Sequence, residues 1–187
     1  MKQYIILLVL VLASISNVFA QKINKDKMEE DGSRVILSES YNLYTKWTSA
    51  AGFYLAYIKN SSDSEEWSFE ITLNEGKLTM GRGRKLLIKT DKGNVFELEN
   101  DKEIGPSDYD YNVSSSGTDY YVKPSYILSE KQIKELLDSN IIKIRIETNG
   151  GSIDRDIKPK KFTKALKEMY EAICLAKTKT NTVYDNF

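Results

Sequence analysis

Apolar and polar residues alternate along much of this chain, and a two-residue period is typical of β-strands that bury one face. The clearest run is 67–73, where aromatic and aliphatic residues occupy every second position. Turns rich in Gly, Asn, Asp and Ser separate such runs at short intervals. The predicted strands are 34–38, 41–47, 53–58, 67–73, 78–80, 85–90, 95–99, 120–123, 126–128, 141–147 and 153–157.

A different period, with apolar residues three and four positions apart, predicts two helices. The first is short and follows Ser129, which suits the N-cap position and forms a capping box with Gln132. Asn140 is expected to end this helix in the left-handed conformation. The second helix begins at Pro159 and carries lysines on the face opposite its apolar stripe. That stripe consists of Phe162, Ala165, Leu166, Met169, Ala172, Ile173 and Ala176.

Together these elements predict the α+β class. We expect a mostly antiparallel β meander or sheet, with a short helix after Leu128 and a C-terminal amphipathic helix packed on the sheet. Residues 50–52 are interpreted as a turn or bulge, and the polar segment 100–118 as a long loop. In strand 141–147, the isoleucines at even positions are expected to share one face.

The N-terminal residues predict a cleaved secretory signal. Lys2 precedes a nearly continuous apolar run at 4–15, and Val18-Phe19-Ala20 has the pattern of a cleavage site before Gln21. The run is short for a membrane span, and no second stretch is long enough for one. A retained N-terminal anchor is the alternative. Cleavage at Ala20-Gln21 predicts an extracytoplasmic location, periplasmic or secreted.

The same pattern divides the chain into four segments. Residues 1–20 are the predicted signal peptide, and the charged segment 21–33 is interpreted as a flexible lead-in. Residues 34–177 are expected to form a single β-rich domain, with 178–187 as a tail.

Composition excludes several kinds of chemistry. The 187 residues include 27 Lys and Arg against 27 Asp and Glu, a balance that does not favour a nucleic-acid partner. There is no histidine, so Ser–His and Cys–His nucleophiles and the commonest zinc ligand are missing. Cys174 is the only cysteine, so no disulfide forms within the chain. No cofactor or metal is predicted.

The tyrosine-rich segment 108–121 supplies the candidate binding site. A tyrosine ring offers a rigid apolar surface with a polar tip, which suits contact with a sugar ring or a protein partner. The candidate ligand-binding residues are Tyr109, Tyr111, Tyr120 and Tyr121. Carboxylates between them are of the type that binds Ca²⁺, but their spacing does not match an EF-hand loop. The alternative is a solvated loop whose tyrosines pack back on the sheet.

Three other patterns each have a chemical and a structural interpretation. The glycine-rich basic stretch 81–85 has the donors for an anion site, but it also suits a bend between strands. The carboxylate pairs Asp154/Asp156 and Glu97/Glu99 have the spacing for glycoside hydrolysis, but also that of any exposed strand face. No catalytic residue is therefore assigned. Cys174 is expected to be half-exposed, without a histidine to activate it.

Three features occur together: Val18-Phe19-Ala20 before Gln21, the hairpin strand 85–90, and the helix-to-strand join at 141–146. In this combination the chain resembles small secreted or periplasmic β-rich proteins of Gram-negative bacteria. The resemblance implies an extracytoplasmic location and assigns no functional residue.

Three functions follow as hypotheses. The first is a non-enzymatic binding domain for a protein or glycan partner, which rests on the tyrosine-rich segment. The second is a small hydrolase that uses paired carboxylates. The third is an assembly or inhibitor protein that adds a strand to a partner through an exposed sheet edge.

Overall fold

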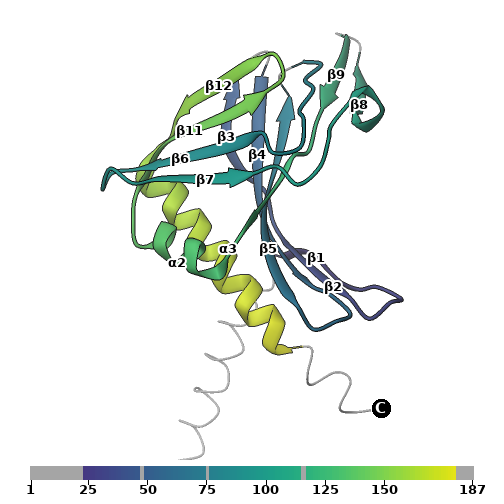
Figure 1. Ribbon diagram of the computed structural model, residues 1–187, viewed down its shortest axis with the longest axis vertical. Helices are drawn as coiled ribbons and strands as arrows, with labels where there is room; N and C mark the ends of the chain where they lie inside the picture. The colour runs from purple at the N-terminus through teal and green to yellow at the C-terminus, as the bar shows by residue number, and fades with distance from the viewer. Residues whose placement is uncertain (1–22, 47–48, 75, 115–116, 180–187) are drawn as a thin grey trace, which may run out of the picture.

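The computed structural model describes residues 23–46, 49–74, 76–114 and 117–179. Within these ranges the α+β class is confirmed, with mostly antiparallel sheets and a C-terminal helix packed on them (Figure 1). The elements are β1 (Ile23–Met28), β2 (Arg34–Ser38), β3 (Tyr41–Lys46), β4 (Ser49–Lys59), β5 (Glu65–Asn74), β6 (Lys85–Thr90), β7 (Val95–Glu99), η1 (Pro106–Asp108), β8 (Asp110–Ser114), β9 (Gly117–Tyr121), β10 (Ser125–Leu128), α2 (Glu130–Leu137), β11 (Ile141–Thr148), β12 (Gly151–Asp156) and α3 (Pro159–Lys179).

The strands form two antiparallel sheets and a separate hairpin. The first sheet has the order β1-β2-β4-β5-β10, and β3 pairs with the first part of β4. The second has the order β12-β11-β6-β7, and β8 pairs with β9 alone. Main-chain pairing between Asn100, just after β7, and Tyr126 of β10 joins the two sheets. The strands of the two sheets run in clearly different directions (Figure 1).

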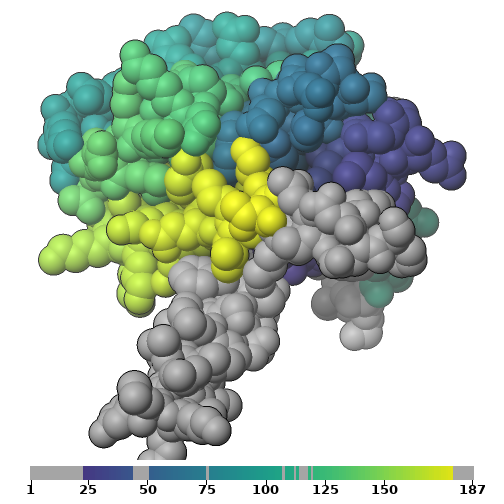
Figure 2. All heavy atoms as spheres, turned by 90° about the horizontal axis from the view of Figure 1, so that it is seen from below, coloured from purple at the N-terminus to yellow at the C-terminus, as the bar shows by residue number. Residues whose placement is uncertain are grey.

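Helix α3 packs across both sheets, because it contacts β1 to β4 of the first and β11 of the second. Phe162 lies at the centre of this contact, with its ring centroid 5.0 Å from that of Phe53. Phe53 in turn meets Phe69 of β5 edge-on at 4.7 Å. The predicted apolar stripe of α3 is buried apart from Ala165, which is half-buried. Figure 2 shows α3, in lime to yellow, crossing this side of the molecule.

The segment expected to be a flexible lead-in contains β1, an edge strand paired with β2. The sequence does not indicate this strand, because most of its side chains are exposed and polar and therefore give no alternation of apolar and polar residues. Arg34 of β2 holds β1 in place through two 2.9 Å hydrogen bonds to Asp26. The same guanidinium donates to the carbonyl of Ala176 at 2.9 Å. One buried side chain therefore ties the edge strand to the C-terminal end of α3.

Two other expectations about strands and loops were wrong, and a third holds in part. Residues 50–52 lie inside β4 and form no turn, but the register of β3 against β4 is irregular opposite Ala51 and Gly52, as a bulge would make it. A Cβ on Gly52 would come within 2.8 Å of the Ser40 hydroxyl oxygen, so close approach also favours glycine here. Segment 78–80 forms no strand, and Met80 makes a single bridge to Ile104. The expected long loop 100–118 contains η1, β8 and the start of β9.

The ends of α2 follow the sequence prediction only in part. The capping box of Ser129 and Gln132 is present at its start. At its end the C-cap is Asp138 with φ −82°, and Asn140 does not adopt the left-handed conformation. Asn140 instead donates to the carboxylate of Asp91. The strand that follows, β11, has an irregular register near its start, so Ile142 departs from the expected alternation.

Candidate functional site

The β8–β9 hairpin carries the tyrosines selected from the sequence and stands at the upper right of Figure 1. Tyr111 pairs with Tyr120 across the hairpin, so their side chains leave on the same face. The chain then runs from β9 along β5, where Val122 and Leu73 exchange main-chain hydrogen bonds of 2.9 and 3.0 Å. This pairing fixes the hairpin beside the end of the first sheet.

A hollow of about 470 Å³ lies between the hairpin and the first sheet. We call it the tyrosine hollow. It brings together side chains from β4, β5, β8, β9 and the segments that flank the hairpin. Its lining residues are Tyr54, Thr72, Tyr109, Asp110, Tyr111, Tyr121 and Lys123. Four phenol rings with a hydroxyl, a carboxylate and an ammonium group give apolar surface and hydrogen-bonding groups in one place.

Of the four tyrosines selected from the sequence, three line the hollow: Tyr109, Tyr111 and Tyr121. Tyr111 is the most open of them, with 66% of its surface exposed. Tyr120 does not line the hollow. Its ring meets that of Tyr109 edge-on at 5.9 Å, and the ammonium group of Lys77 lies 4.8 Å from its centroid. Tyr120 therefore packs against Tyr109 but does not line the hollow.

The two charges of the hollow compensate each other. The ammonium group of Lys123 forms an ion pair with the carboxylate of Asp110, and both side chains are more than half exposed. Such an exposed pair adds little stability, but it leaves the hollow without a net charge. A ligand that fits it needs no charge of its own.

Sequence reasoning missed Tyr54 and Thr72. Both lie on the face of the first sheet that points away from Phe53 and the buried aromatic core. Segment 53–58 is apolar on both faces, so its sequence does not single out Tyr54. Nothing in the local pattern shows that the hairpin, more than fifty residues later, comes to lie beside it. The Leu73–Val122 pairing and the hydrogen bond from the N–H of Ile71 to the carbonyl of Pro124 bring these segments together.

The glycine-rich stretch 81–85 does not form an anion cradle. The main-chain N–H of Gly81 and Nε of Arg84 both donate to the side-chain oxygen of Asn149, each at 3.1 Å. The N–H of Gly83 donates to the carbonyl of Asn100 at 2.9 Å, and Gly83 has φ +79°. The main-chain N–H groups of Gly81 and Gly83 and Nε of Arg84 are thus used within the protein.

In each of the two carboxylate pairs with the spacing for glycoside hydrolysis, one member is engaged in an ion pair. Asp154 accepts two hydrogen bonds from Arg145, at 2.5 and 2.7 Å, and pairs with Lys143 at 3.1 Å. The Arg145 guanidinium holds the pKa of Asp154 far below its usual value, which opposes a general-acid role near neutral pH. Glu97 is paired with Lys85 at 2.6 Å on an exposed strand face.

Cys174 is half-buried on α3, as expected from its place off the apolar stripe. Burial raises the pKa of its thiol, which opposes formation of the reactive thiolate. Lys177, one turn further, is occupied by an ion pair with Glu65 at 2.8 Å. Within the described part of the chain, no group of three or more acidic or cysteine side chains is placed to hold a metal ion.

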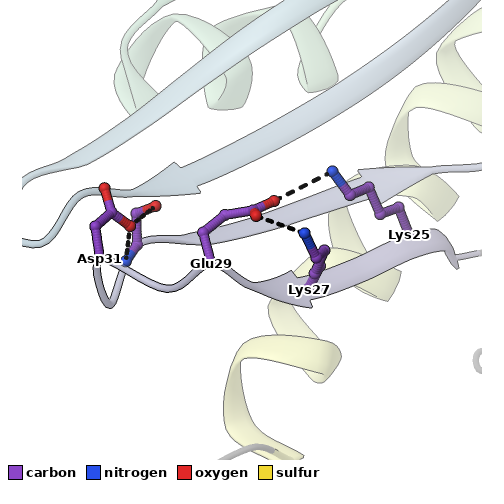
Figure 3. Close-up of polar contacts among 5 residues, drawn as sticks. Lys25, Lys27, Glu29 and Asp31 are labelled. Carbon is purple, nitrogen blue, oxygen red and sulfur yellow. Dashed lines mark hydrogen bonds and ion pairs between the residues drawn. The ribbon is translucent and has the colours of Figure 1, made fainter.

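Strand β1 forms one outer edge of the first sheet, and its charges bear on strand addition. Figure 3 shows the carboxylate of Glu29, just after β1, pointing toward the ammonium groups of Lys25 and Lys27. It forms ion pairs with them at 3.5 and 2.6 Å. Asp31 closes the adjoining turn by accepting from the main chain and hydroxyl of Ser33. Charged side chains on an edge strand discourage pairing with a second chain, so this edge does not favour the assembly hypothesis.

Comparison with known proteins adds no assignment to this geometry. No family model matches the chain, and neither a curated protein nor a solved structure is similar to it. Among the helices in the described ranges, none combines the length and apolar character needed to cross a membrane. The predicted signal peptide at 1–20 lies outside the described residues.

Proposed function

We propose that this chain is an extracytoplasmic binding domain, secreted or periplasmic, that holds a glycan through the tyrosine hollow. The observation that carries the proposal is the grouping of four tyrosines with Thr72, Asp110 and Lys123 in a hollow of about 470 Å³. This volume is within the range of small-ligand sites, about 300–1,000 Å³. The location rests on the signal pattern at residues 1–20.

A sugar matches this lining better than a charged ligand or a purely apolar one. The C–H face of a sugar ring packs on a phenol ring, while its hydroxyls need the donors and acceptors that surround the rings. Because the Asp110–Lys123 pair cancels the local charge, a neutral sugar enters without leaving an uncompensated charge. A protein partner is the second candidate, since exposed Tyr111 and Val113 form an apolar strip on β8.

The test is a glycan array probed with the chain from residue 21 onward, beside a variant with Tyr111→Ser. Tyr111 is expected to pack one face on the sugar, and loss of that contact should weaken binding by roughly ten- to a hundredfold. The matched control is Val113→Ser, an equally exposed apolar residue on the same strand that does not line the hollow. It should bind like the unchanged protein.

Capture of envelope proteins on the same set of variants separates the two partner classes. Glycan binding that falls with Tyr111→Ser and not with Val113→Ser supports the proposal. A protein captured by the unchanged chain and lost equally in both variants would move the function to a protein interface on β8. Equal glycan binding by all three proteins would contradict the tyrosine hollow as the site.

A further inference from the structure

The irregular start of β11 creates a second hollow on the other side of the molecule. Ile141 pairs with Thr90 and Lys143 with Lys89, so Ile142 is an extra residue between two ladder positions. Ile141 keeps its place in the core, whereas Ile142 is only half-buried. A bulge of this kind redirects a side chain that regular alternation would bury.

Ile142 lines a groove of about 490 Å³ beside the first turn of α3. We call it the lysine groove. Its apolar surface comes from Ile142, Pro159 and the aliphatic stems of nearby lysines. The lining residues are Asp91, Asn140, Ile142, Lys158, Pro159, Lys160 and Lys161. The groove thus has an apolar floor and a rim that carries three ammonium groups.

The positive charge of this rim is only partly compensated, because three lysines face one carboxylate. In the described part of the chain, Lys158, Lys160 and Lys161 form no ion pair. The one carboxylate that lines the groove, Asp91, already accepts from the main-chain and side-chain nitrogens of Asn140, at 3.0 and 2.7 Å. The pKa of Asp91 is lowered, chiefly by these hydrogen bonds. It remains charged, but its oxygens are occupied.

The N-terminus of α3 adds to the positive electrostatic potential at the rim of the lysine groove. A helix of 21 residues begins here, with Pro159 first and no acidic residue in its first turn. Positive side chains at the positive end of a helix dipole are unfavourable, and most helices place Asp or Glu there. The chain therefore lacks the negative charge that this position favours, and an anion from outside would supply it.

We propose that the lysine groove binds a single-chain anionic amphiphile, a molecule with one acidic group on an unbranched apolar body. The apolar body lies on Ile142 and Pro159, and the acidic group lies among the three ammonium groups of the rim. Charge complementarity selects an anion, and the apolar floor selects one with a hydrocarbon portion. This site is separate from the tyrosine hollow, and neither proposal depends on the other.

The test is a calorimetric titration with decanoate, kept below its micelle concentration. 1-Decanol and acetate are the comparison ligands, because each keeps one half of the amphiphile. Decanoate should bind at least tenfold more tightly than either, and its affinity should fall as salt screens the lysines. Lys160→Gln/Lys161→Gln should weaken decanoate binding about tenfold, as should Ile142→Thr.

The matched control is Lys131→Gln/Lys164→Gln, which removes the same charge from exposed helix positions outside the groove. It should bind decanoate like the unchanged protein. Acetate binding as tight as decanoate would overturn the role of the apolar floor. Decanoate binding unaffected by both the Lys160/Lys161 and the Ile142 changes would place the site elsewhere. Binding only to vesicles of anionic phospholipid, with none to decanoate, would replace the amphiphile by a membrane surface.

Discussion

The link from Arg34 to Asp26 and to α3 gives the most specific stability prediction. The Arg34 side chain is only 8% exposed, while Asp26 is 37% exposed. Asp26→Ala therefore leaves a buried guanidinium with only the carbonyls at the end of α3 as partners. Arg34→Met leaves a carboxylate that water can reach, and the methionine refills part of the space. The two changes should thus have unequal costs.

The magnitudes follow from that difference in burial. Removing one partner of a fully buried ion pair costs about 3–5 kcal/mol in free energy of unfolding. The helix carbonyls retain part of the favourable contact with Arg34, so we expect about 2–3 kcal/mol for Asp26→Ala. For Arg34→Met we expect about 1–2 kcal/mol, mainly from the carbonyl of Ala176 that loses its donor. The double variant should cost about as much as the larger single change.

Urea unfolding followed by tryptophan fluorescence measures these differences, because Trp67 lies in the core beside β4. A double-mutant cycle should give a coupling free energy of at least about 1 kcal/mol. Lys27→Met is the control on the same strand, since its ion pair with Glu29 is exposed and should contribute less than about 0.5 kcal/mol. Strictly additive single changes would refute the view that Arg34 and Asp26 act as one unit.

Three further predictions concern the core, a helix cap and pH. Phe162→Ala should lower the free energy of unfolding by about 3–5 kcal/mol, since this buried ring fills the contact between α3 and the sheet; a change below about 1 kcal/mol in urea unfolding would contradict that role. Ser129→Ala should cost about 1 kcal/mol by the same measurement, because it removes the acceptor at the N-terminus of α2; Ser129→Asp, which restores an acceptor, should recover most of it. The pKa of Asp154 is lowered by Arg145, so its contribution is present above the pKa of the unfolded chain, near 4, and is lost as pH falls below that value. Thermal unfolding of Asp154→Asn should therefore converge with that of the unchanged protein as pH falls from 6 to 2, and a constant difference would argue against the ion pair.

Local patterns in the sequence were sufficient for much of the fold. Strand β5 and the β6–β7 hairpin follow directly from two-residue alternation and glycine-containing turns. The capping box of α2 was readable because Ser129 and Gln132 are only three residues apart. In each of these elements, the interactions that determine the structure are close in sequence.

The elements that were missed depend on distant contacts. Strand β1 is mostly exposed, so its polar residues give no alternation, and its place depends on Arg34 and on α3. The bulge at Ile142 requires β6 as a pairing partner, which no window within β11 can reveal. Asn140 was assigned a backbone role because asparagine tolerates the left-handed conformation, but it is used for its hydrogen bonds to Asp91.

In the candidate site, too, some features follow from the local sequence and others depend on distant contacts. Its tyrosines were recognisable because they are close together in sequence, and three of the four line one hollow. Tyr120 was assigned the same role, yet its ring packs edge-on against Tyr109 and does not line the hollow, a contact that the local sequence does not show. The contribution of Tyr54 depends on the pairing of Leu73 with Val122, which joins distant parts of the chain.

Tyr54 provides the most direct test of the tyrosine hollow, because it lies on β4 and outside the tyrosine-rich segment. The measurement is the affinity of Tyr54→Thr for the glycan that binds the unchanged protein most tightly on the array, with unfolding measured alongside to show that the fold is kept. A glycan held in the hollow contacts both the sheet and the hairpin, so the affinity should fall roughly tenfold or more. An unchanged affinity, in a variant that remains folded, would show that the hairpin acts without the hollow and would contradict the proposed site.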